Sequence, residues 1–200
     1  MMQIHNIIAN SYKDFHTKGL DYICTERTPE RTVKYYFFNG DVTKIPEVVN
    51  PHDHRYSFSS KVLAGSMVNH VFKRRDHGEV YQAFDYMTPL NGGDGFTYRG
   101  EEYLYHYATQ LVTRNHTYYS TASDIHTIQI MEDQTVLKLI QNFDYVPLDE
   151  PTSCWTKTKI KPDTSGLYSK FKEDEILARL KVIEALDAAL SNPILPVRSS

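Results

Sequence analysis

The stretch VVNPHDHRYSFSSKVLAGSM, Val48–Met67, joins a turn to a segment with the composition of a β-strand, and it carries two histidines at the junction. His52 and His54 are separated by one residue. Alternate residues of a strand share a face, so both imidazoles are expected on the face that continues along the segment. The residues expected on that face after the histidines are Tyr56, Phe58, Ser60 and Val62. Along this face, side chains that can bind a metal are therefore followed by apolar ones. This is the order expected from the open end of a small barrel towards its closed end.

Runs of similar composition follow one another along the centre of the chain and define the expected fold class. They are rich in Val, Ile, Tyr, Phe and Thr, turn residues separate them, and no helical pattern interrupts the series. The expected strands are Val33–Phe38, Tyr56–Leu63, Ser66–Phe72, Glu79–Met87, Phe96–Arg99, Glu101–Tyr107, Gln110–Tyr119, Ile125–Ile130 and Thr135–Gln141. Strands without intervening helices predict a mainly β protein, an antiparallel sandwich or small barrel rather than a parallel α/β sheet.

A helix is expected near each end of the chain. Apolar residues recur with a period near 3.6 over Gln3–Lys18, and again in the segment that begins at Glu173. The second apolar stripe consists of Ile176, Leu177, Leu180, Ile183, Leu186 and Leu190. This stripe must pack on an outer sheet face or on a partner subunit, so a homodimer is among the expectations.

The length of 200 residues fits one domain with a substantial core. We expect a single domain over residues 1–200, with the first helix within residues 1–20 and a β-barrel over residues 33–145. Residues 146–200 are expected to form an extended arm, which contains several prolines, and the C-terminal helix.

Composition argues against several classes of partner. The formal net charge is −3 and the longest basic run is KRR at Lys73–Arg75, so nucleic acid is not an expected partner. No segment approaches the roughly 18 to 20 apolar residues of a membrane span, and we expect a cytoplasmic protein. Cys24 and Cys154 are expected to be reduced thiols. The 15 tyrosines are the unusual feature, because tyrosines in strands can line a pocket with hydroxyl groups.

A third histidine stands in a similar setting in the segment SDIHTIQI, Ser123–Ile130. On a strand, His126 would share its face with Ile128 and Ile130, so the histidine is again the first member of an apolar face. Three imidazoles in one apolar pocket would be costly without partners, and a divalent metal removes that cost. The alternative is a barrel of the same kind in which the histidines are hydrogen-bonded and bind no metal. His116 is expected at the surface or behind the ligands rather than as a ligand, and the other histidines have no partner at ligand spacing.

The two histidine segments resemble the motifs of a known superfamily. PHDH followed by SKVLAGSM resembles the first motif of the cupins, and DIHTIQIMEDQTVLKLI resembles the second motif of the thiol dioxygenases among them, the cysteamine dioxygenase, plant cysteine oxidase and cysteine dioxygenase type. The resemblance implies a cupin-type antiparallel barrel or jelly roll. It also implies Fe(II) held by His52, His54 and His126, and oxidation of a small thiol or cysteine sulfur to a sulfinate by O2.

Three positions depart from the family pattern. Phe58 and Ser59 stand where many metal-binding cupins have a glutamate, and Ser59 also stands about where some thiol dioxygenases have a cysteine cross-linked to a tyrosine. Lys138 replaces an aspartate of the plant enzymes, although it is expected on the outside if Leu137 and Leu139 point inward. The substrate is therefore left open.

Residues near the motifs supply candidates for the rest of the site. Tyr56 shares the inward face of the histidines and is the expected catalytic side chain, and Arg55 directly follows the second ligand. Arg114 and Tyr118 are expected on one strand, interspersed with Val112 and His116, where they would offer a cation and a hydroxyl to a substrate carboxylate. Two other functions remain open: a metal-dependent cupin that cleaves carbon–carbon bonds, and a cupin module that binds a ligand without turnover.

Overall fold

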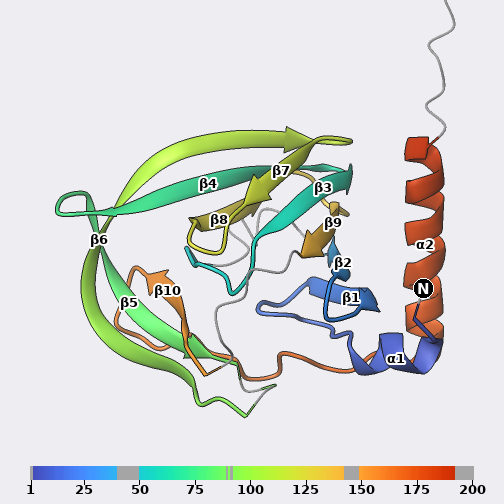
Figure 1. Ribbon diagram of the computed structural model, residues 1–200, viewed down its shortest axis with the longest axis horizontal. Coiled ribbons are helices and arrows are strands. Elements are labelled where there is room, and N and C mark those ends of the chain that lie inside the picture. The colour runs from blue at the N-terminus through green and yellow to red at the C-terminus, as the bar shows by residue number, and fades with distance from the viewer. Residues whose placement is uncertain (1, 40–49, 89, 91, 142–148, 192–200) are drawn as a thin grey trace, which may run out of the picture.

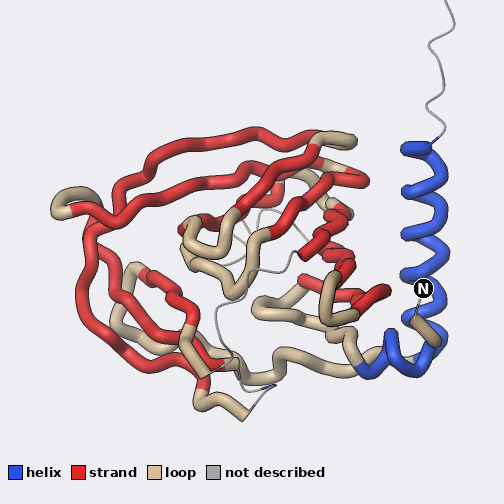
Figure 2. The backbone as a smooth tube through the Cα atoms, in the orientation of Figure 1, coloured by secondary structure: helices blue, strands red, loops and turns tan. Residues whose placement is uncertain are grey.

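The computed structural model describes residues 2–39, 50–88, 90, 92–141 and 149–191, and strands are its main secondary structure (Figure 1 and Figure 2). The elements are α1 (Ile4–Ala9), β1 (Leu20–Arg27), β2 (Thr32–Phe38), β3 (Phe58–Ala64), β4 (Ser66–Arg75), β5 (Glu79–Met87), β6 (Gly95–Thr113), β7 (Thr117–Ser120), β8 (Ile125–Ile130), β9 (Val136–Gln141), β10 (Thr152–Thr156) and α2 (Glu173–Ser191).

The strands form two curved antiparallel sheets. The first has the order β1-β2-β9-β3-β7 and the second the order β10-β5-β6-β4-β8. The chain crosses between them repeatedly: β3 and β4 lie in different sheets, and so do β7, β8 and β9 in turn. Two antiparallel sheets wound in this way form a jelly roll, the architecture found in cupins. The prediction of a mainly β, cupin-type fold with a helix near each terminus is confirmed.

The segment that carries the first two histidines closes the second sheet. His52 forms isolated bridges to His126 in β8 and to Cys154 in β10, which are the two edge strands of that sheet. The backbone N–H of His52 donates to the His126 carbonyl at 3.0 Å, and that of Trp155 donates to the Pro51 carbonyl at 2.9 Å. The histidine segment is therefore fixed by backbone pairing on both sides, although it lies outside the regular strands.

Alternation along the strands of the first sheet separates an inner and an outer core. The inner core fills the space between the sheets and contains Phe58, Val62, Leu137 and Leu139, among other residues. The outer core lies between the opposite face of this sheet and the helices, beside which α2 stands in Figure 1. Its members from α2 are Ile176, Leu180 and Ile183. The apolar stripe of α2 is thus covered by the sheet of the same chain, except for Leu177, which is 45% exposed.

Several predicted boundaries are wrong. The helix expected over Gln3–Lys18 is found only over Ile4–Ala9, and the strand β1 that follows was not predicted. The two strands expected over Phe96–Tyr107 are one strand, which continues to Thr113 as β6. The strand expected over Gln110–Tyr119 is interrupted by a turn in which Asn115 has a φ of 70°. The turn at Gly40–Asp41 and the start of the arm at residues 146–148 lie outside the described residues. Among the helices that the structure describes, none has the length and apolarity that a membrane crossing needs.

Candidate metal centre

Three histidines from two parts of the chain meet at one end of the inner core. His52 and His54 lie on the segment between β2 and β3, and His126 is the second residue of β8. The bridge between His52 and His126 brings the two parts together. Because Ile128 and Ile130 follow His126 into the inner core, the inward face predicted for this segment is confirmed.

The three rings are in mutual contact. Ring centroids are 4.6 Å apart for His52 and His54, 5.2 Å for His52 and His126, and 4.9 Å for His54 and His126. One nitrogen of each ring lies within 4.8 Å of a nitrogen of the other two. Nitrogen ligands about 2.1 Å from one metal ion are separated by distances somewhat below this value, so a small movement of the side chains suffices for coordination.

Hydrogen bonds orient two of the imidazoles for metal binding. His126 Nδ1 donates to Asn69 Oδ1 at 2.7 Å, and His52 Nδ1 donates to the Asn50 carbonyl at 2.8 Å. A proton on Nδ1 leaves a lone pair on Nε2, which is the arrangement that metal-binding histidines use. His54 Nδ1 is buried and has no hydrogen-bond partner among the described residues. The donor set therefore fits a transition metal, which would satisfy ring nitrogens that the protein leaves unpaired.

The three imidazoles are held in their neutral form. Burial lowers the pKa of His52, and it lowers the pKa of His54 and His126 well below the usual value. Protonation of His52 or His126 would lower the pKa of His54 further, and the charge of Lys34 acts in the same direction. Neutral imidazoles are the form that binds metals, so little proton release is needed at neutral pH.

Aromatic residues surround the histidines on the inside of the barrel. Phe58 meets His54 edge to face at a centroid distance of 4.9 Å, and Tyr118 meets Phe58 in the same way at 5.9 Å. Tyr36 and Tyr56 also pack against the inner core. Burial raises the pKa of Tyr36 and of Tyr118, which keeps both phenols neutral. The tyrosine-rich composition thus supplies hydroxyl groups to the region around the candidate centre.

The substrate-binding candidates lie in three different places. Tyr118 faces the inner core, and its ring centroid is 6.2 Å from that of His126. Arg55 directly follows the ligand segment and donates to Met87 Sδ at 3.6 Å. Arg114 lies exposed in the turn between β6 and β7, beside Asn115, whose N–H donates to the Val62 carbonyl. Val62 is four residues beyond Phe58 along β3, so Arg114 is at the far end of the strand from the histidines. The expectation that Arg114 and Tyr118 lie on one strand is wrong, because β6 ends at Thr113 and β7 begins at Thr117.

Two residues near the histidines were missed in the sequence. Lys34 lies on the inner face of β2 and donates to the Tyr56 hydroxyl at 2.8 Å. His16, a residue with a positive φ of 65°, lies close enough for desolvation, and for repulsion from a protonated His52 and from Lys34, to lower its pKa. Its side chain is exposed, and its Nδ1 contacts the Tyr168 hydroxyl at 2.9 Å. The sequence signal that could have identified Lys34 as a site residue is its position within an otherwise apolar strand segment.

Of the three departures from the family pattern, Phe58 lies in the inner core, whereas Ser59 and Lys138 face away from the inside of the barrel. Ser59 alternates with the inward residues Phe58 and Ser60, and it therefore faces away from the histidines. Lys138 contacts Asp187 of α2 at 3.1 Å, while Leu137 and Leu139 belong to the inner core. The predicted outward position of Lys138 is confirmed.

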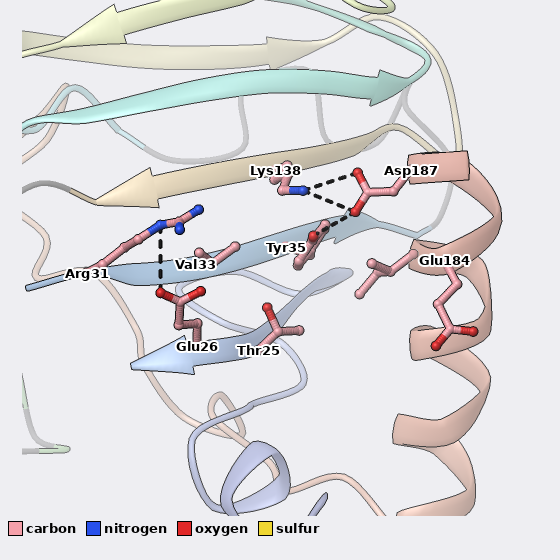
Figure 3. Close-up of a pocket in the computed structure, with 9 residues that line it drawn as sticks. Thr25, Glu26, Arg31, Val33, Tyr35, Lys138, Glu184 and Asp187 are labelled. Atoms are coloured by element: carbon pink, nitrogen blue, oxygen red, sulfur yellow. Dashed lines mark hydrogen bonds and ion pairs between the residues drawn. The ribbon is translucent and has the colours of Figure 1, made fainter. Parts of the chain in front are cut away.

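A cavity of about 430 Å³ lies between the first sheet and α2, on the side of the sheet away from the histidines (Figure 3). Four of the five charged residues that line it form two ion pairs: Lys138 with Asp187, and Arg31 with Glu26 at 3.7 Å. The Tyr35 hydroxyl also donates to Asp187, at 3.0 Å. The two contacts of Asp187 hold α2 against the sheet, so the cavity is part of the interface between them.

Comparisons with known proteins find solved structures with low similarity to this chain. No protein-family model and no curated protein sequence matches the chain. An RmlC-like cupin from Shewanella frigidimarina is 13% identical, with a TM-score of 0.40 over 67% of this chain and 86% of its own. A hydroxypropylphosphonic acid epoxidase from S. wedmorenis is 11% identical, with a TM-score of 0.41 over 72% and 59%. A hydroquinone 1,2-dioxygenase in complex with Cd2+ is 13% identical, with a TM-score of 0.37 over 73% of each chain. The fold assignment rests on the strand order, and the assignment of the candidate metal centre rests on the geometry of the three histidines.

Proposed function

We propose that this protein is a non-haem Fe(II) dioxygenase that oxidises the sulfur of a small thiol or a cysteine to a sulfinate. The observation that carries the proposal is the convergence of three neutral imidazoles without a carboxylate. Asp53, which lies between His52 and His54, accepts from the backbone N–H of Ser153 at 2.6 Å. Among the residues that the structure describes, the group that can hold a metal consists of His52, His54 and His126 alone.

The charge of this ligand set favours an anionic substrate atom. Three neutral ligands leave the full double charge on a divalent metal, and such a centre binds and stabilises a thiolate. Bound Fe(II) would supply open coordination positions and the redox chemistry that combines a thiolate with O2. Both atoms of O2 end on sulfur, so that RSH and O2 give RSO2H. No external reductant is consumed.

The residues around the histidines would position the reactants and exclude water. Phe58 is 2% exposed and forms an apolar wall beside His54 and His126. Tyr56 lies beside Phe58 and His54, with ring centroids 6.3 Å and 6.0 Å away, and we assign its hydroxyl the role of holding a proton near the substrate. Orientation of two reactants within such a wall is a major part of what a protein contributes to a reaction of this kind.

The first test is metal binding by the wild-type protein and two histidine variants. After anaerobic addition of Fe(II) and removal of the excess, plasma mass spectrometry should find close to one iron per wild-type chain. His126→Ala should lose this iron, because one of three ligands is missing. His116→Ala is the matched control, since His116 is exposed and its Nδ1 contacts Thr113 Oγ1 instead. Circular dichroism of each variant shows whether it is folded.

The second test is turnover. The iron-loaded protein should consume O2 in the presence of a thiol and release the sulfinate, detected by mass spectrometry with a mass increase of two oxygen atoms, and His126→Ala should do neither. Iron binding with diketone cleavage and no thiol oxidation would replace the proposal with the carbon–carbon cleaving reaction. Ligand binding without O2 uptake would identify a module without turnover.

A further inference from the structure

Lys34 is a buried cation inside the barrel. It lies on β2, where Val33, Tyr35 and Phe37 belong to the outer core, and alternation directs Lys34 to the inner side. Its side chain is 5% exposed. Its Nζ is 2.8 Å from the Tyr56 hydroxyl and 4.3 Å from the centroid of the Tyr56 ring. The Tyr22 ring is 5.7 Å away.

Among the described residues, no acidic side chain neutralises this cation, because no carboxylate of this part of the chain lies within 4 Å of Lys34 Nζ. Other partly buried cations of the chain are paired with acids, Arg179 with Asp21 at 2.6 Å and Lys138 with Asp187 at 3.1 Å. A buried charge without a counter-charge costs stability, because a hydroxyl and two aromatic faces replace only part of its hydration. Buried charges that lower the stability of the protein in this way are commonly found at sites that bind a ligand.

The position of Lys34 relates it to the candidate metal centre. The Tyr56 ring is close to both: its centroid is 4.3 Å from Lys34 Nζ and 6.0 Å from the centroid of the His54 ring. A molecule of a few heavy atoms can therefore reach from the histidines to the ammonium group.

We propose that Lys34, assisted by the Tyr56 hydroxyl, binds an anionic group of the substrate, and that the substrate is an acidic thiol with a carboxylate a few bonds from its sulfur. The carboxylate would accept hydrogen bonds from Lys34 Nζ and from the Tyr56 hydroxyl, while the sulfur lies at the three histidines. A substrate whose far end is an ammonium group would be repelled by Lys34. The thiol half of this inference rests on the proposed function, whereas the anion-binding half rests on Lys34 and Tyr56.

The test uses a redox-inert metal and a matched pair of ligands. The Zn(II)-loaded protein is titrated by calorimetry with 4-mercaptobutyrate and with its uncharged amide, 4-mercaptobutanamide. Wild-type protein should bind the acid at least about tenfold more tightly than the amide, the range of one charge-assisted hydrogen bond. Lys34→Met should reduce this ratio to about twofold or less, and Lys34→Arg should restore part of it. Tyr56→Phe should reduce the ratio by a smaller factor.

Lys61→Met is the matched control, because Lys61 lies on the same sheet but alternates with the inward residues Ser60 and Val62. It should keep the wild-type ratio. Lys34→Met should fold without a lower melting temperature, because no carboxylate loses its partner. A melting temperature lowered by many degrees, with an unchanged ratio, would show that Lys34 is structural and would overturn the inference. Equal affinities of the acid and the amide for wild-type protein would overturn it as well.

A second titration separates failure of the inference from failure of the proposed function. Metal-free protein is titrated with butyrate and with butyramide, which have no thiol. If zinc and iron do not bind but butyrate binds in a Lys34-dependent manner, the proposed function fails and the anion site stands. If the metals bind and neither acid shows any dependence on Lys34, the inference fails and the metal centre stands.

Discussion

At the candidate metal centre, the amide of Asn69 decides which nitrogen of His126 is available. Asn69 is 4% exposed on β4, and its Oδ1 accepts the Nδ1 proton of His126 at 2.7 Å. Loss of such a partner frees the imidazole to rotate and to change tautomer, which typically lowers metal affinity 10- to 100-fold. Metal affinity at this centre therefore depends on Asn69 as well as on the three histidine ligands.

We predict that Asn69→Leu lowers Zn(II) affinity by about 10- to 100-fold while the protein remains folded. Leu has a similar volume, but it cannot accept the His126 proton. Competition with a chromogenic chelator measures the affinity. Gln129→Leu serves as the control, because Gln129 Oε1 contacts His70 Nε2 and alternates with the inward residues of β8. Equal affinities of the two variants would refute the assigned role of Asn69.

At the scale of the elements, helix α2 is held to the first sheet by an apolar stripe and by ion pairs at its rim. Ile176 is fully buried in the outer core, and the neighbouring Leu177 is 45% exposed. The pairs of Arg179 with Asp21 and of Lys138 with Asp187 flank this stripe. Removal of buried methyl groups costs more than removal of exposed ones, because a cavity is added to the lost transfer free energy.

We predict that Ile176→Ala lowers the free energy of unfolding by about 2–5 kcal/mol. Leu177→Ala, one residue along the helix, should change it by no more than about 0.5 kcal/mol. Urea denaturation followed by circular dichroism measures both values. If the two variants were equally destabilised, the orientation of α2 described above would be incorrect.

The N-terminal segment is tied to α2 through a carboxylate whose pKa is lowered. Lys13 bonds to Glu175 at 2.8 Å, and the backbone N–H of Lys172 donates to the same carboxylate, so the pKa of Glu175 is below its ordinary value of 4.5. A lowered pKa means that the stabilisation is present above pH 4.5 and is lost as the pH falls through the folded-state pKa.

We predict that thermal stability falls less steeply in Glu175→Gln than in wild type as the pH falls below 4.5. Above that pH, wild type should be the more stable of the two. Melting curves recorded from about pH 3 to 7 at low salt measure the difference. Parallel pH profiles would exclude a contribution from this carboxylate.

Local patterns account for the elements that the sequence predicted. The strand Ile125–Ile130 has the predicted bounds, and α2 begins at the predicted Glu173, because an apolar period of 2 or 3.6 is visible within each segment alone. Strand β1 has no such period. Both of its faces are covered, by the inner core and by the outer core, so Leu20–Cys24 are all buried. A strand buried on both sides loses the alternation that identifies it.

The site residues differ in the same way: those that a local sequence pattern marks could be predicted, and those that depend on distant contacts could not. The ligands could be predicted because histidines at the start of apolar faces are conspicuous, and the structure brings all three together. Arg114 could not be placed correctly, because the turn at Asn115 reverses the chain. Lys34 was missed because its significance depends on Tyr56, which is 22 residues away, and on the absence of a nearby acid among the described residues.

For the whole molecule, a bound metal would join two segments that are distant in the sequence. His54 precedes β3 of the first sheet, and His126 belongs to β8 of the second. A ligand that binds only the folded state stabilises it in proportion to the logarithm of its concentration. The homodimer expected from the helices stays a prediction, although the stripe of α2 is already covered within the chain.

We predict that Zn(II), at a free concentration about 100-fold above its Kd, stabilises the wild-type protein by about 2.7 kcal/mol. His126→Ala should show no such increase at the same concentration, and His116→Ala should match wild type. Differential scanning calorimetry with and without the metal measures the shift. A similar shift in all three proteins would indicate binding elsewhere on the molecule.

The closure of the second sheet by the histidine segment has a kinetic consequence. Asp53 and Ser153, which bond to each other beside His52, are 100 residues apart in the sequence. Contacts that close so long a loop carry a high entropic cost before they contribute stability, so this segment should dock late in folding, after the β4, β5 and β6 hairpins have formed. Interactions made after the rate-limiting step leave the folding rate unchanged and slow unfolding. A metal bound at this centre would therefore slow unfolding and lengthen the lifetime of the native state, and it would leave the folding rate unchanged.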